Sequence, residues 1–201
     1  MKPVGRGRSE LSESEASPAS ASDTPSHVVG IGASAGGLAA LQLLLSRFTL
    51  DTTAFVVVMH LMPARESHLS AILSRATKMS VETAAHRKTL RKNCIYVIPP
   101  GFALTVTDGD RLCMTTLPPT SPRWTIDRLF ESLSALGRAS VGVILSGNGP
   151  DGSKGLEAIK GRGGATFVQE PATASNPDMP TSARAFADYC ISCSTRRALL
   201  R

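Results

Sequence analysis

Long hydrophobic runs are missing from this chain of 201 residues. The longest apolar stretches, such as Ala54–Met59, fall far short of the roughly 18 to 20 residues that a membrane-spanning helix needs, so we expect no membrane insertion. Residues 1–26 contain basic clusters but no apolar segment of the kind found in secretory signals. The sequence therefore predicts a cytoplasmic location.

Aromatic residues and cysteines are also scarce. The net charge is +6, but aromatics make up only 4% of the chain, which argues against the stacking platforms that bind single strands, and we expect no nucleic-acid partner. Four cysteines are too few and too scattered for a disulfide framework, so we interpret them as small buried apolar residues. Cys190 and Cys193 form a C-x-x-C pair, but no second ligand pair at zinc spacing accompanies it, and we predict no metal.

Composition divides the chain into two parts. Residues 1–26 hold seven serines, three prolines and no aromatic residue. Such a segment cannot bury enough apolar area to offset the conformational entropy lost on ordering. We therefore predict a disordered tail over residues 1–26 and one globular domain over residues 27–201.

Within the second part, short apolar strand patterns alternate with helical patterns, which is typical of an α/β protein. The predicted strands of the main sheet are Val28–Ala33, Ala54–Met59, Cys94–Ile98, Val141–Leu145 and Ala165–Gln169. The predicted helices are Gly36–Arg47, Glu66–Thr77, Ile126–Leu136 and Ser153–Lys160. The segments Ala103–Thr107 and Arg111–Thr115 predict an antiparallel hairpin. We expect a doubly wound, mostly parallel sheet with helices on both faces and this small hairpin beside it.

The glycine-rich stretch at residues 30–37 lies between a predicted strand and a predicted helix, where phosphate-binding loops occur. It lacks the Gly-Lys-Ser/Thr of a Walker A loop, so we exclude nucleoside triphosphate hydrolysis. Gly30, Gly32 and Ala35 do match the dinucleotide fingerprint G-x-G-x-x-G/A. The next strand, however, ends without the acidic residue that would bind the ribose, and dinucleotide binding remains a weaker alternative.

The same stretch also matches the nucleophile turn G-x-S-x-G, in which a sharp bend between strand and helix exposes a serine hydroxyl. That serine is Ser34. His60 follows the second predicted strand, and Asp151 lies in a glycine-rich turn after the strand Val141–Leu145. Because the carboxyl ends of parallel strands meet at one edge of a sheet, we predict a catalytic triad of Ser34, His60 and Asp151. No histidine follows Asp151, so the order of the three excludes an ordinary α/β-hydrolase.

With these three turns identified, the chain resembles the catalytic domain of the chemotaxis methylesterase CheB, most closely the version found in fusions with the methyltransferase. The likeness runs from about residue 28 to residue 188. The matching stretches are VGIGASAGGL (29–38), FVVVMHL (55–61), YVIPP (96–100), IDRLF (126–130), GVILSGNGPDG (142–152) and Met-Pro (179–180).

By this resemblance, Ser34 is the nucleophile, His60 the general base and Asp151 the carboxylate that orients it. The family hydrolyses γ-methyl esters of glutamate on methyl-accepting chemotaxis receptors, and some members also deamidate receptor glutamines. Both reactions transfer an acyl group to water through a serine ester. The resemblance implies no cofactor and no metal, and a chemoreceptor or a similar methylated signalling protein as the partner.

Several positions depart from the family's usual pattern. Met59 replaces a Gln, Trp124 replaces a Pro, and Asn148 and Pro150 stand beside the expected oxyanion site, where Pro150 supplies no backbone N–H. The stretch His86–Lys92 is basic, and the residues before the domain are too few for a receiver domain, so we expect no regulation by phosphorylation within this chain. The alternative is a binding module with weakened catalysis that docks on an acidic helical partner through the basic stretch.

Overall fold

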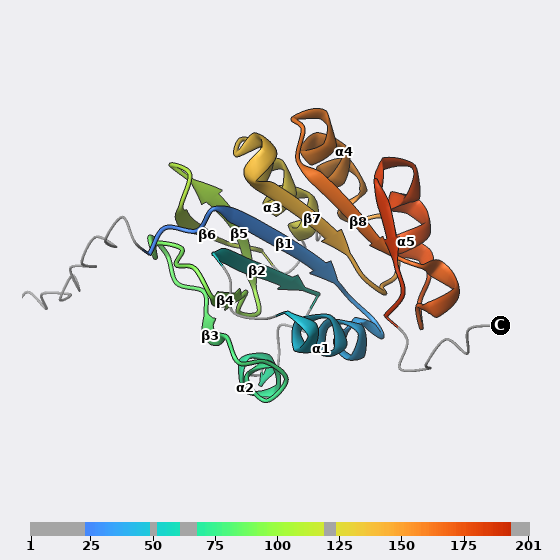
Figure 1. The fold of residues 1–201 in the computed structure, drawn as a ribbon, viewed down its shortest axis with the longest axis horizontal. Helices are drawn as coiled ribbons and strands as arrows, with labels where there is room; N and C mark the ends of the chain where they lie inside the picture. Colours follow the sequence, from blue (N-terminus) through green and yellow to red (C-terminus); the bar gives the residue numbers. More distant parts are fainter. Residues whose placement is uncertain (1–22, 49–51, 61–67, 119–123, 194–201) are drawn as a thin grey trace, which may run out of the picture.

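The computed structural model describes residues 23–48, 52–60, 68–118 and 124–193 (Figure 1). Its centre is a seven-stranded sheet with the order β3-β4-β2-β1-β7-β8-β9, in which every pairing is parallel. These strands are β1 (His27–Ala33), β2 (Thr53–Met59), β3 (Ser80–Thr83), β4 (Cys94–Val97), β7 (Ser140–Ile144), β8 (Ala165–Gln169) and β9 (Tyr189–Ile191). β5 (Phe102–Thr107) and β6 (Arg111–Thr116) form the separate antiparallel hairpin. The expected doubly wound α/β fold with its hairpin is confirmed.

Helices cover both faces of the sheet, as predicted (Figure 1). The α-helices of the described residues are α1 (Gly37–Arg47), α2 (Leu69–Ser74), α3 (Thr125–Ser134), α4 (Ser153–Gly161) and α5 (Asp178–Ala183). Short 3-10 helices occupy Gly137–Ala139, Pro171–Thr173 and Arg184–Phe186. Leucines of α1 and α2 pack on one face, and α3, α4, α5 and the hairpin pack on the other.

The central strands are apolar along their whole length because both faces are buried. Along β2, Val56 and Val58 pack toward α3 and α4, while Phe55 and Val57 pack toward α1 and α2. All four side chains are at most 1% exposed. This double burial explains why the sequence of β2 shows a continuous apolar run instead of an alternating pattern.

The two glycines of the apparent dinucleotide fingerprint have a packing role. A Cβ at Gly30 would lie 2.6 Å from the Leu133 side chain, and one at Gly32 would lie 2.4 Å from the Ile126 side chain. α3 therefore packs directly on the backbone of β1, and any larger residue at either position would push it away. This contact accounts for both glycines without a bound nucleotide.

The order of the strands places the point where the winding reverses beside β1. The chain passes from β1 to β2 on one side and returns later to β7 on the other side. In open parallel sheets, ligands bind at the carboxyl ends of the strands where the winding reverses. The turns after β1 and β7 flank this position, and they contain the predicted Ser34 and the glycine-rich stretch before Asp151.

Some elements differ from the sequence-based expectations. The helix predicted over Glu66–Thr77 spans only Leu69–Ser74 among the described residues. Beyond its end, Thr77 Oγ1 accepts the Met79 N–H at 3.2 Å, just before β3 begins. β3, β9 and α5 were not predicted, since they are three to six residues long and α5 follows a proline and contains another. Residues 66–67 and 1–22 of the predicted segments lie outside the described residues.

The expectation that all four cysteines are buried is confirmed only for Cys94. Cys94 is buried, Cys113 and Cys193 are partly exposed, and Cys190 is exposed. Cys190 lies on β9, which is an edge strand of the sheet and has a second strand on one side only. No helix in the described part of the chain is both long enough and apolar enough to cross a membrane.

Candidate active site

Ser34 and His60 leave the sheet side by side. Ala33 and Met59 are the last registered pair of β1 and β2, and the His60 N–H donates to Ala33 O at 3.2 Å. The Ser34 N–H donates in the other direction, to Ser146 O just past β7, at 2.9 Å. The turn that carries the serine is therefore fixed on both sides by backbone hydrogen bonds.

The side chains of His60 and Asp151 meet at this edge. His60 Nε2 lies 2.7 Å from Asp151 Oδ2, and the two side chains are 16% and 5% exposed. The contact joins residues that are 91 positions apart, as the sequence predicted from the ends of two strands. Because Nε2 is engaged by the carboxylate, Nδ1 is the ring nitrogen left to take a proton. Within the described part of the chain, no hydrogen bond joins the Ser34 hydroxyl to the His60 ring, so the third link of the triad remains a prediction.

Asp151 is held in place by the first turn of α3. Its Oδ2 accepts the N–H of Ile126 at 3.1 Å, and its Oδ1 accepts the N–H of Asp127 at 3.0 Å. The residue at the N-cap of α3, Trp124, makes no side-chain cap, so the carboxylate of Asp151 supplies the acceptors that the helix start lacks. The N-terminal end of a helix also favours a negative charge. The two N–H contacts fix the orientation of the Asp151 carboxylate toward His60.

Asp127, in the first turn of α3, caps α4 in a similar way. Its Oδ1 accepts the N–H of Gly155, in the first turn of α4, at 2.8 Å. The Asp127 side chain is buried. Burial raises the pKa of the Asp127 carboxyl, the Gly155 N–H opposes that shift, and the nearby charge of Asp151 adds to it. Asp127 stands in the stretch IDRLF, but no role for it was predicted from the sequence; its position in the first turn of a predicted helix was the available signal.

Ser146 is a second residue that the sequence analysis missed. It is fully buried, and its Oγ donates to Ala35 O at 2.9 Å and accepts the Asn176 N–H at 2.9 Å. Its own N–H donates to Gln169 Oε1 at 2.9 Å. Ser146 thus ties the nucleophile turn to the segment that follows β8. A polar residue directly after an apolar strand was the signal in the sequence.

Gly147 allows the backbone after β7 to pass close to the serine. A Cβ at this position would lie 2.0 Å from Met179 Sδ and 2.7 Å from Ser34 Cβ. The Met179 N–H donates to Gly147 O at 3.0 Å, and Met179 is fully buried. Any side chain at Gly147 would displace Ser34 or Met179, so this glycine is required by the close approach of three segments.

The unusual residue Asn148 is part of the rim of the site. Its Oδ1 accepts a hydrogen bond from Asn176 Nδ2 at 3.0 Å, and it is exposed. Within the nucleophile turn, the backbone N–H groups of Ala35 and Gly36 donate to no described residue. Both N–H groups are therefore open to an acceptor on a ligand, which is what an oxyanion hole requires.

The basic stretch His86–Lys92 is more closely packed than a solvated loop. Arg91 Nη2 lies 2.6 Å from Glu82 Oε1, and Lys88 pairs with the other oxygen of Glu82. Leu90, between them, is fully buried. The single negative charge of Glu82 is therefore shared by two of the positive side chains, which reduces what the stretch can offer to an acidic partner.

Known proteins resemble this chain over most of its length. The family model described as CheB methylesterase matches residues 29–195. A protein-glutamate methylesterase/protein-glutamine glutaminase of Maricaulis maris is 30% identical over 159 residues, which cover 76% of this chain and 40% of that protein. A protein of the same description from Saccharophagus degradans is 29% identical over 89% of this chain and 53% of its own length. The chain spans about half the length of these curated relatives.

A shorter relative and a solved structure match over nearly their full lengths. A putative protein-glutamate methylesterase/protein-glutamine glutaminase of Leptospira interrogans is 32% identical over 176 residues, which cover 81% of this chain and 86% of that protein. The crystal structure of the Thermotoga maritima CheB methylesterase catalytic domain aligns with a TM-score of 0.74 and 24% identity, over 83% of this chain and 93% of the other. This likeness confirms the fold.

Proposed function

Because this chain belongs to the CheB methylesterase family, we propose that it hydrolyses γ-methyl esters of glutamate side chains on a methylated signalling protein, of which a methyl-accepting chemotaxis receptor is the leading candidate. The observation that carries the proposal is the 2.7 Å contact between His60 Nε2 and Asp151 Oδ2 beside Ser34. The four free thiols of the described residues agree with a reducing compartment, and we propose the cytoplasm.

In the proposed first step, His60 Nδ1 takes the proton of the Ser34 hydroxyl while Ser34 Oγ attacks the ester carbonyl carbon. Asp151 accepts a hydrogen bond from His60 Nε2 and stabilises the imidazolium that forms. The backbone N–H groups of Ala35 and Gly36 are the proposed donors to the developing oxyanion. When the tetrahedral intermediate collapses, the C–O bond to the methoxy group breaks and methanol leaves with the proton from His60.

The second step reverses these roles with water as the nucleophile. His60 removes a proton from a water molecule, whose oxygen attacks the carbonyl carbon of the serine ester. The bond to Ser34 Oγ then breaks, the serine regains its proton, and a free glutamate side chain remains on the substrate protein. With a glutamine substrate, the same sequence would release ammonia in place of methanol, and we include glutamine deamidation as a second reaction of this site.

Covalent labelling of the serine tests the proposed nucleophile directly. A fluorophosphonate probe reacts with serines that a neighbouring base activates. We expect mass spectrometry to locate the label on Ser34, and we expect His60→Gln to slow the labelling strongly. Labelling that is unchanged by Ser34→Ala, or that occurs on another serine, would overturn the assignment.

A further inference from the structure

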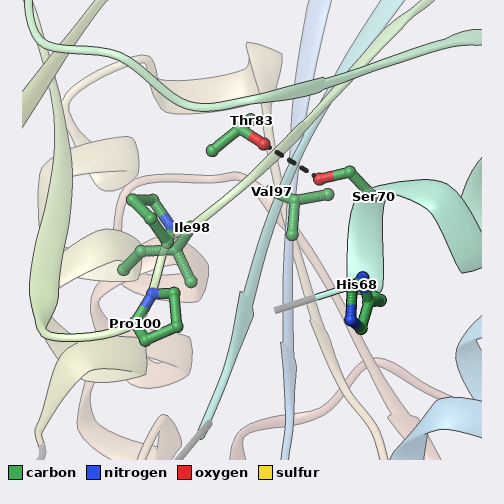
Figure 2. A pocket seen from close by; sticks show the side chains of 7 residues that line it. His68, Ser70, Thr83, Val97, Ile98 and Pro100 are labelled. Carbon is green, nitrogen blue, oxygen red and sulfur yellow. Dashed lines mark hydrogen bonds between the residues drawn. The ribbon is translucent and has the colours of Figure 1, made fainter. Parts of the chain in front are cut away.

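A separate pocket of about 300 Å³ opens beyond β2, between the ends of β3 and β4 and the start of α2 (Figure 2). We call it the edge pocket. Its lining residues are His68, Ser70, Thr83, Val97, Ile98, Pro99 and Pro100. Figure 2 shows His68 and Ser70 on the α2 side and Ile98 and Pro100 on the opposite side, with Val97 and Thr83 between them. None of these residues belongs to the proposed triad.

The edge pocket lies at the same edge of the sheet as the triad. β4 is the direct neighbour of β2, with Val57 registered against Val97, and the Ile98 N–H still donates to Val57 O at 3.0 Å. His60 and Pro100 each lie three residues beyond that registered pair. The histidine therefore leaves the sheet between Ser34 on one side and the edge pocket on the other.

The chemistry of the lining favours an uncharged occupant. Among the residues that the structure describes, no Lys, Arg, Asp or Glu lines the pocket, and Pro99 and Pro100 have no backbone N–H to offer. The Ser70 and Thr83 hydroxyls lie 3.1 Å apart and share one hydrogen bond. The remaining walls are the His68 ring and the apolar surfaces of Val97, Ile98 and the two prolines, so a ligand gains contact with the pocket mainly by burying apolar area.

We propose that the edge pocket binds an apolar side chain of the same substrate protein whose glutamyl ester reaches Ser34. This inference rests on the proposed function. Because the pocket and the triad lie at the same edge of the sheet, a substrate protein bound at Ser34 is the molecule that can reach the pocket. Ser34 follows β1, and the pocket follows β4, two strands away. Two strand spacings amount to about 10 Å. That distance separates residues about three positions apart in an extended substrate or about seven positions apart in a helical one.

The variant Thr83→Arg tests the pocket with little risk to folding. Thr83 is exposed and lies at the end of an edge strand, so an arginine there places a charge at the pocket without disturbing the core. Thr107→Arg is the matched control, because it adds the same charge at an exposed strand end in the separate hairpin. We expect Thr83→Arg to lower kcat/KM for a methylated receptor fragment at least tenfold and to leave p-nitrophenyl acetate hydrolysis unchanged. The control is expected to change neither.

A substrate scan identifies the occupant. Replacing single apolar residues of the receptor fragment with aspartate should reduce kcat/KM at one position, three or seven residues from the esterified glutamate. That position should lose its effect in the Thr83→Arg enzyme, as expected for two groups in contact. If no position shows this coupling, or if Thr83→Arg hydrolyses the fragment at the wild-type rate, the pocket has no part in substrate binding and the inference is overturned.

Binding to a protein that cannot turn over separates this inference from the proposed function. The Ser34→Ala protein should bind a fluorescently labelled methylated fragment, and adding Thr83→Arg should raise the Kd at least tenfold. If binding depends on the pocket while the wild-type protein releases no methanol, the esterase proposal fails and the pocket stands. If methanol is released and binding is indifferent to Thr83→Arg, or if no fragment binds, the pocket proposal fails.

Discussion

Asp127 and Asp151 each cap the helix that adjoins the other. Asp151, one residue before the N-cap of α4, accepts two N–H groups from the first turn of α3, and Asp127, in that turn, accepts the Gly155 N–H of α4. The two helices therefore hold the proposed catalytic carboxylate from both sides. Its orientation toward His60 is set by secondary structure that forms the core.

Replacing Asp151 by asparagine removes the negative charge of the side chain while keeping its shape, so it tests the role of the charge in catalysis. The amide introduced by Asp151→Asn would offer one oxygen acceptor where the carboxylate uses two, and it could not stabilise a positively charged His60. By comparison with the loss that follows from this change in a serine protease, we expect kcat to fall on the order of 10³- to 10⁴-fold. Ester hydrolysis and thermal unfolding, measured on the same preparation, check the prediction. A kcat within tenfold of the wild type would show that Asp151 does not orient the base.

Because Asp127 is buried, we expect the difference in stability between the wild type and Asp127→Asn to depend on pH. Its pKa is raised on folding, with burial as the main cause, so the ionised carboxylate costs stability above the folded pKa and this cost disappears as the pH falls toward the unfolded value of 3.8. Asp127→Asn keeps an oxygen acceptor for Gly155 without the charge. We expect the variant to be at least as stable as the wild type at pH 7, with the difference shrinking toward pH 4 in urea unfolding.

The alanine variant serves as the contrast. Asp127→Ala leaves the Gly155 N–H without its acceptor, which should make it about 1 to 3 kcal/mol less stable than Asp127→Asn at every pH. If Asp127→Asn and Asp127→Ala were equally destabilised at pH 7, the hydrogen bond to α4 would not be the stabilising element.

For Glu82, on the edge strand β3, we expect the contribution to folding stability to depend on pH in the opposite direction. Burial acts to raise the pKa of this carboxyl, but the hydrogen bond and charge of Lys88 and the charge of Arg91 outweigh it, and the net pKa is lowered. A lowered pKa contributes stability that is present above the unfolded value of 4.5 and is lost as the pH falls through the folded value. Glu82→Gln should therefore be less stable than the wild type at pH 7 and should converge with it below about pH 4. A constant difference across this range would contradict the ion-pair account.

We expect Ser146→Ala to lose activity because Ser146 positions the turn that carries Ser34. Removing its hydroxyl in Ser146→Ala breaks the bond to Ala35 O and leaves the Asn176 N–H unpaired. Ser140→Ala is the matched control, since Ser140 is equally buried at the other end of β7 and donates to Gly137 O at 2.6 Å. We expect both variants to lose about 1 to 3 kcal/mol of stability. Only Ser146→Ala should lower kcat for small esters, and equal kcat values in the two variants would contradict the role.

The proposed site could be predicted from the sequence because it depends on the ends of strands. Apolar runs locate the strands, and residues that follow parallel strands gather at one edge whatever the remaining sequence is. Ser34, His60 and Asp151 do lie at the same edge. The supporting residues could not be found in this way, because the partners of Asp127 and Ser146 are backbone groups 28 to 111 positions away, and backbone groups leave no trace in a sequence.

Other parts of the fold followed from contacts rather than from local patterns. β3 and β9 are short edge strands whose residues pair with a longer neighbour, so their own composition is a weak signal. Gly30 and Gly32 suggested a nucleotide site, but the side chains that require them belong to α3, which comes much later in the chain. Tertiary packing determined both the short edge strands and the two glycines, and local sequence patterns carry no information about it.

Methanol release from a methylated receptor fragment is the most direct test of the proposed function. The wild-type chain, Ser34→Ala and the exposed control Ser46→Ala should be compared at matched thermal stability, with mass spectrometry to identify the free glutamate that is formed. We predict release by the wild type and by Ser46→Ala, and none above the uncatalysed rate by Ser34→Ala. Release that persists in Ser34→Ala, or a wild-type chain that binds the fragment and releases no methanol, would contradict the assignment of this site as a protein-glutamate methylesterase.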